Sequence, residues 1–149
     1  MINNEYIKAY KKTQQSSNTV ISSHQIVRAL MKELVNSMQK IVLDIQDDRT
    51  RKKDEFSTDK NLAKKNRQIK AKNLSKSLSI LYGLQTSLDF DKALEIATNL
   101  FQLYEYCRVQ IISGFTKSIN DGIIKAKKAL DQILSAWNNM QIKNIYNVR

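Results

Sequence analysis

The chain contains no proline and only three glycines among its 149 residues. Tight turns and the corners between strands rely on these two residues, so a chain that nearly lacks them favours long helices joined by few connections. Apolar residues make up 42% of the sequence, which is enough for one hydrophobic core in a chain of this length. We therefore predict an all-α protein with a single domain.

Apolar residues recur at steps of three and four in four segments, as in helices that bury one face. The first segment follows the potential N-cap residues Ser22 and Ser23 and covers about six turns, from residue 26 to residue 45. Residues 46–59 are polar and are expected to form a solvated loop. The second helix is expected to begin near Lys60 and to bury the following stripe: Leu62, Ile69, Leu74, Leu78, Leu81, Leu84 or Gln85, and Leu88.

Two further helices complete the pattern. The third is expected to begin after a cap at Asp89 or Asp91 and to end near Ser118. The fourth is expected to begin at Asn120 or Asp121. The third stripe consists of Ala93, Ile96, Ala97, Leu100, Leu103, Tyr104, Cys107, Ile111 and Phe115, and the fourth of Ile123, Ile124, Lys127, Leu130, Ile133, Leu134 and Trp137.

Four helices with short later connections pack naturally as an antiparallel four-helix bundle. We expect a flexible N-terminal arm at residues 1–21, the bundle at residues 22–140 and a C-terminal tail at residues 141–149. Trp137 is expected to close the end of the core with its indole N–H facing a polar partner, although it could instead belong to a binding surface.

The sequence offers no set of residues that could perform catalysis. His24 is the only histidine and Cys107 the only cysteine, so neither a metal site nor an intrachain disulfide can be assembled from them. No glycine-rich phosphate loop is present. We predict that the protein is not an enzyme and uses no cofactor or metal. We also expect no membrane insertion and a cytoplasmic location, because the first residues lack a secretory pattern and the lone cysteine suits a reducing compartment.

The net charge of +11 points to an acidic partner, which could be a nucleic acid, an anionic membrane or an acidic protein. Residues 49–76 hold eleven basic and three acidic side chains, so this one stretch accounts for +8 of the charge. Its only aromatic residue is Phe56, whereas proteins that bind single strands interleave stacking aromatics with the charge. A basic helical nucleic-acid-binding protein therefore stays an alternative that the sequence disfavours.

Several short motifs occur in order along the chain and resemble those of the flagellar secretion chaperone family (FliS). The N-terminal motifs are Ile7-Lys8-Ala9-Tyr10 and Ser23-His24-Gln25-Ile26. The later motifs are Ser87-Leu88-Asp89, Glu95-Ile96-Ala97-Thr98-Asn99-Leu100, Leu103-Tyr104-Glu105-Tyr106 and a closing Trp137. The chain departs from the family pattern in having a longer, more basic segment before the second helix's matched end, and Ala93-Leu94 where the family has two glycines.

The resemblance implies a four-helix bundle that binds the C-terminal segment of flagellin in the cytoplasm. That segment is disordered when free, and covering it would prevent premature polymerisation and present flagellin for flagellar type III secretion. Components of the export apparatus are further candidate partners. Apolar residues outside the expected stripes, together with two in the arm, are the candidate client contacts: Ile7, Tyr10, Leu94, Phe101, Tyr106 and Ile112.

Overall fold

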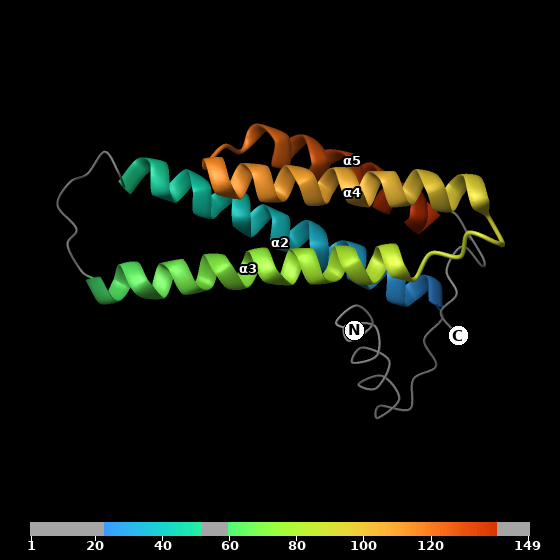
Figure 1. Cartoon of the computed structure of the whole chain (residues 1–149), viewed down its shortest axis with the longest axis horizontal. Helices are drawn as coiled ribbons and strands as arrows, with labels where there is room; N and C mark the ends of the chain where they lie inside the picture. Colours follow the sequence, from blue (N-terminus) through green and yellow to red (C-terminus); the bar gives the residue numbers. More distant parts are fainter. Residues whose placement is uncertain (1–22, 52–59, 140–149) are drawn as a thin grey trace, which may run out of the picture.

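The computed structural model describes residues 23–51 and 60–139, and these residues form four α-helices with no strand among them. The helices are α2 (Ser23–Arg51), α3 (Lys60–Thr86), α4 (Leu94–Lys117) and α5 (Asp121–Asn139). Helix α2 packs against α3 and α5, and α4 packs against the same two helices, so the four close into a bundle (Figure 1). The predicted all-α four-helix bundle is confirmed. The predicted arm and tail, with Ile7 and Tyr10, lie outside the described residues.

Helix α2 is longer than predicted, because residues 46–51 continue the helix instead of forming a loop. Residues 46–51 bury little side-chain surface, and polar contacts to neighbouring elements fix this last part of α2. Asp48 forms an ion pair with Lys70 of α3, and the Nε of Arg49 donates to the carbonyl of Ser118 at 3.1 Å. The apolar stripe therefore underestimates the length of a helix whose end is fixed by charged side chains.

The core runs along the inner faces of all four helices and includes Tyr104, which is completely buried. Most residues of each predicted stripe are buried or half-buried as predicted, but the predicted burial of four residues is wrong. Their exposed fractions are high: Leu62 47%, Ile69 46%, Ile96 46% and Ile124 44%. In α3 the buried residues begin only at Ser77. The first half of this helix therefore keeps a periodic apolar pattern although neighbouring helices do not cover it.

The sequence predicts the C-terminal end of α4 correctly but not its N-cap. The expected caps at Asp89 and Asp91 are wrong, because Ala93 holds the N-cap position and makes no side-chain capping bond. Asp89 instead shapes the preceding turn, where its Oδ1 accepts the backbone N–H of Asp91 at 3.0 Å and of Lys92 at 3.2 Å. The predicted end near Ser118 is confirmed, since Ser118 adopts a left-handed conformation with φ 55°.

The end of the core is closed by Trp137, as predicted. Trp137 is 3% exposed, and its Nε1 donates to the backbone carbonyl of His24 at 3.2 Å. The two rings stack with their centroids 4.9 Å apart. This contact gives the only histidine a structural partner and joins the start of α2 to the end of α5.

Across residues 23–51 and 60–139, no helix is both long and apolar enough to cross a membrane. The same residues contain no group of three metal-ligating side chains that could hold a metal ion.

Candidate functional site

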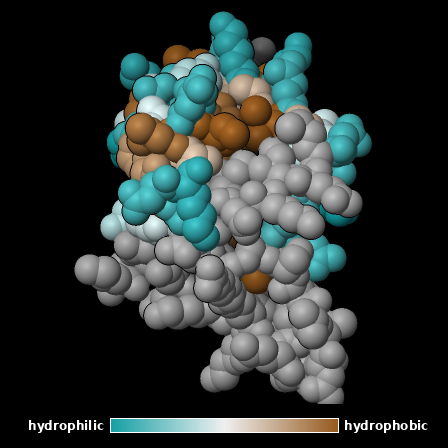
Figure 2. Space-filling view, turned by 90° about the vertical axis from the view of Figure 1, so that its right-hand side faces the viewer, coloured by the Kyte–Doolittle hydropathy of each residue, from teal (hydrophilic) through white to brown (hydrophobic). Residues whose placement is uncertain are grey.

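A hollow of about 710 Å³ lies between α3 and α4, close to the connection that joins them. We call it the α3–α4 groove. Figure 2 looks onto this end of the molecule and shows apolar surface gathered between hydrophilic side chains. The groove is lined by Tyr82, Gln85, Thr86, Leu88, Phe90, Phe101, Glu105 and Arg108. Pockets of this size hold a ligand or a few side chains of a partner.

Three aromatic side chains give the groove its apolar character. Phe90 lies in the turn shaped by Asp89, and its ring meets that of Phe101 edge to face with a centroid distance of 6.1 Å. Phe90 is 39% exposed, Phe101 41% and Tyr82 47%. Large side chains that are held in place and still meet water are the usual anchors of a protein interface, because a partner gains free energy by covering them.

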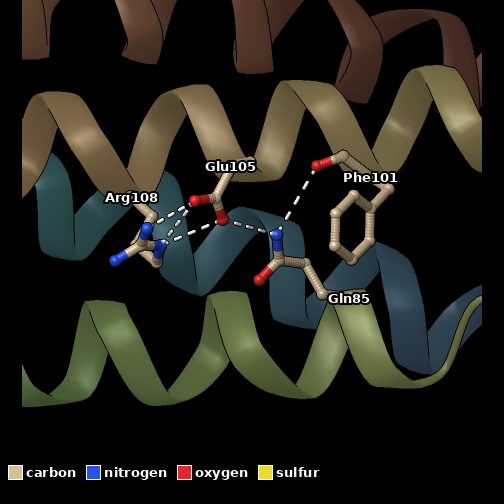
Figure 3. Close-up of polar contacts among 4 residues, drawn as sticks. All are labelled: Gln85, Phe101, Glu105 and Arg108. Carbon is tan, nitrogen blue, oxygen red and sulfur yellow. Dashed lines mark hydrogen bonds and ion pairs between the residues drawn. The ribbon is translucent and has the colours of Figure 1, made fainter.

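A chain of polar contacts crosses the groove and fixes the spacing of its two walls (Figure 3). The Nε2 of Gln85 on α3 donates to the carbonyl of Phe101 at 3.5 Å and to Oε2 of Glu105 at 3.2 Å. The Nε of Arg108 donates to both carboxylate oxygens of Glu105, at 2.9 and 3.1 Å, and its terminal nitrogen contacts the same carboxylate. Every donor in the network therefore converges on Glu105 or on the backbone beside it.

These contacts keep the network charged. Hydrogen bonds from Arg108 first and from Gln85 second lower the pKa of Glu105 to about 2, against a smaller opposing effect of desolvation. The same carboxylate raises the pKa of Arg108. The groove consequently presents an apolar centre beside a fixed ion pair at any pH near neutral, which suits an amphipathic peptide better than a purely apolar ligand.

The structure groups some of the client contacts predicted from sequence and separates another. Leu94, Phe101 and Ile112 are 66%, 41% and 38% exposed and lie within about 20° of one another around α4. Tyr106 is also exposed, at 41%, but points about 140° away from Phe101. The first three thus form one line on the face of α4 from which Phe101 lines the groove, whereas Tyr106 belongs to a different face.

Sequence reasoning missed the residues that α3 and the turn contribute, namely Tyr82, Gln85 and Phe90. Tyr82 and Phe90 could have been found by the criterion that selected Phe101, since they are aromatic and lie outside the predicted stripe. The apolar stripe predicts either Leu84 or Gln85 in the core, and Gln85 is indeed only 7% exposed. Its role as a bridge depends on the approach of α4, which no local pattern reveals.

Fold and site together define a helical bundle with a preformed groove suited to a protein segment. Comparison with known proteins identifies the family within this class. The family model described as flagellar protein FliS matches residues 6–144, and the chain belongs to this family.

A curated relative supports the same placement. The chain is 33% identical over 75 residues to the flagellar secretion chaperone FliS of Salmonella typhimurium (strain LT2). The matched segment covers 50% of this chain and 56% of the relative, so the similarity spans about half the length of that protein.

Proposed function

We propose that the protein is a flagellar secretion chaperone that binds the C-terminal segment of flagellin in the cytoplasm. Binding would prevent premature polymerisation of flagellin and present it for flagellar type III secretion. Membership of the FliS family and similarity to the flagellar secretion chaperone of Salmonella support this proposal. The observation that carries it is the α3–α4 groove, whose aromatic residues stay exposed on an otherwise well-packed bundle.

The groove suits a client that folds as it binds. A disordered segment loses conformational entropy when it becomes ordered, so the chaperone must offer apolar contacts at a regular spacing. Leu94, Phe101 and Ile112 provide such a row, which extends over about 27 Å of α4. An amphipathic helix of roughly 18 residues could lay its apolar side along this length.

Isothermal titration of the full chain with a flagellin C-terminal peptide tests the proposal. We expect a negative heat-capacity change, because binding covers apolar surface. We also expect less than about a threefold change in affinity between about 50 and 200 mM salt, whereas a nucleic acid held through six phosphate contacts would lose about a thousandfold. Failure to bind the peptide combined with tight, salt-sensitive binding of DNA or RNA would favour the alternative function.

A pair of variants localises the binding site. Phe101→Ala should weaken peptide binding at least about tenfold, equivalent to about 1.4 kcal/mol, because it removes the aromatic anchor of the groove. Ile124→Ala is the matched control, since Ile124 is 44% exposed but lies on α5, away from the groove. Equal effects of the two substitutions would show that the client does not use the groove.

The candidates outside this row need separate tests. Tyr106→Ala reports whether the client also reaches the other face of α4. Ile7 and Tyr10, carried over from the family resemblance, are tested by deleting residues 1–15. We expect this deletion to change peptide affinity while the thermal midpoint of the bundle stays nearly constant, and a parallel loss of both would assign the arm a purely structural role.

A further inference from the structure

Helix α3 has an unusual distribution of charge. It contains seven basic residues and no acidic one, and all seven lie between Lys60 and Lys76. Many of them repel one another at spacings of three or four residues, and Lys60, in the first turn, opposes the positive end of the helix dipole. Natural sequences retain such local conflicts mainly where function requires them.

The bundle compensates only part of this charge. Lys70 forms an ion pair with Asp48, and Lys76 forms one with Glu33, so α2 neutralises two of the seven. Within the residues that the structure describes, no carboxylate forms an ion pair with the other five, which are Lys60, Lys64, Lys65, Arg67 and Lys72. All five are exposed, so this end of α3 presents concentrated positive charge to the solvent.

Apolar residues alternate with lysines along one face of this end. Leu62 is 47% exposed and Ile69 46%, and Lys65 and Lys72 each follow one of them by three residues. At the pitch of an α-helix the four lie within an arc of about 80°. We call this face, Leu62, Lys65, Ile69 and Lys72, the basic stripe.

We propose that the basic stripe docks an acidic amphipathic helix of another protein. Carboxylates of the partner would face Lys65 and Lys72, and apolar residues at the same spacing would cover Leu62 and Ile69. The positive charge of the stripe favours an acidic partner. The alternation of lysines with apolar residues at helical spacing favours a partner that is an amphipathic helix. A nucleic acid would use the lysines but leave both apolar residues in water, and residues 60–76 offer no aromatic side chain for stacking.

The basic stripe is separate from the α3–α4 groove. Lys65 and Gln85 are twenty residues apart on one continuous helix, which corresponds to about 30 Å. Figure 1 shows the start of α3 and its connection to α4 at opposite ends of the helix. The inference therefore goes beyond the proposed client site, and both surfaces can be occupied at the same time.

Fluorescence anisotropy with the full chain tests this second surface. The probe is a labelled helical peptide of about 20 residues, with leucine at every seventh position and glutamate three positions after each leucine. A second probe replaces the leucines by serine and keeps the charge. We expect the leucine-containing peptide to bind at least about tenfold more tightly, because only it can cover the apolar residues of the stripe.

Two double variants with the same change in net charge separate specific docking from general attraction. Lys65→Glu with Lys72→Glu should weaken binding of the leucine-containing peptide at least about tenfold, since it reverses the charge of the stripe. Lys64→Glu with Arg67→Glu is the control on a face about 120° away and should cost less than about threefold. Circular dichroism checks that both variants keep the helical content of the parent chain.

The proposal is overturned if the two double variants lose affinity equally, or if the two peptides bind equally well, since either result reports net charge alone. Tighter binding of a single-stranded oligonucleotide or of vesicles containing phosphatidylserine would also overturn it. Flagellin-peptide binding, measured on the same variants, should stay within about twofold of the parent chain. That measurement makes failure of the stripe distinguishable from failure of the client site.

Discussion

Gly114 on α4 allows α5 and its connection to approach closely, and replacing it by alanine tests how tightly the bundle is packed. A Cβ at this position would lie 2.6 Å from the backbone carbonyl oxygen of Ile119 and 2.6 Å from the Cδ1 of Ile123. Atoms cannot approach so closely without movement, and one of the two neighbours is backbone. The substitution therefore forces α4 away from the start of α5 or distorts the turn between them.

Two effects of opposite sign determine the size of the change. Alanine in place of glycine favours a helix interior by about 1 kcal/mol. Overpacking of a filled core costs about 1–3 kcal/mol, and we take the upper part of this range because a carbonyl group must shift. The net expectation is a loss of about 1–2 kcal/mol, which corresponds to a fall in Tm of about 2–8 °C for a chain of this length.

Thermal and urea unfolding followed by circular dichroism measure this loss. Gly122→Ala is the matched control, because its Cβ would meet the side-chain oxygen of Gln110, which lies at the end of a flexible side chain and can move away. We expect Gly122→Ala to leave the free energy of unfolding unchanged or to raise it slightly. If Gly114→Ala proved as stable as the parent chain, α4 and α5 would not be packed as closely as described.

Three further expectations concern single side chains. Tyr104→Ala should lower the free energy of unfolding by about 2–4 kcal/mol in urea unfolding, because the ring is fully buried; a near-neutral result would contradict its place in the core. Glu105 contributes stability that is present above about pH 4.5 and is lost as the pH falls towards 2, because its pKa is lowered to about 2. Glu105→Gln should therefore flatten the dependence of Tm on pH in this window, and an unchanged profile would refute the network. Burial raises the pKa of Cys107 to about 12, so its thiol should react with a thiol reagent only as the chain unfolds.

The fold could be predicted from sequence because helices that bury one face leave a periodic trace. The stripes from Ile26 to Ile45 and from Ala97 to Phe115 correspond closely to buried or half-buried residues of α2 and α4. The scarcity of proline and glycine had already excluded most other architectures. Such evidence is local, and it is therefore reliable wherever neighbouring helices cover the whole length of a stripe.

The sequence predicts burial and helix ends wrongly where a neighbouring element determines them. Leu62 and Ile69 continue the periodicity of α3, yet they stay exposed because the buried part of this helix begins later. Residues 46–51 lack apolar anchors, yet they remain helical because Asp48 and Arg49 reach other elements. Neither fact can be read from one helix alone.

The candidate site was predicted only in part for the same reason. Exposed apolar residues on α4 could be identified as those outside its stripe, and Leu94, Phe101 and Ile112 do share a face. The opposite wall, with Tyr82 and the bridging Gln85, depends on how α3 lies against α4. Tyr106 shows the limit of the criterion, since exposure by itself does not bring a residue to the groove.

Helix α3 runs without interruption from the basic stripe to the wall of the groove, and this continuity has a thermodynamic consequence. A helix moves largely as a rigid rod, so any rotation of α3 that seats a partner on the stripe also displaces Tyr82 and Gln85. Under such a rotation the two binding equilibria are linked, and each partner changes the affinity for the other by the same factor. Under that rotation, a partner seated on the basic stripe changes the affinity of the groove for its client without any contact between the two.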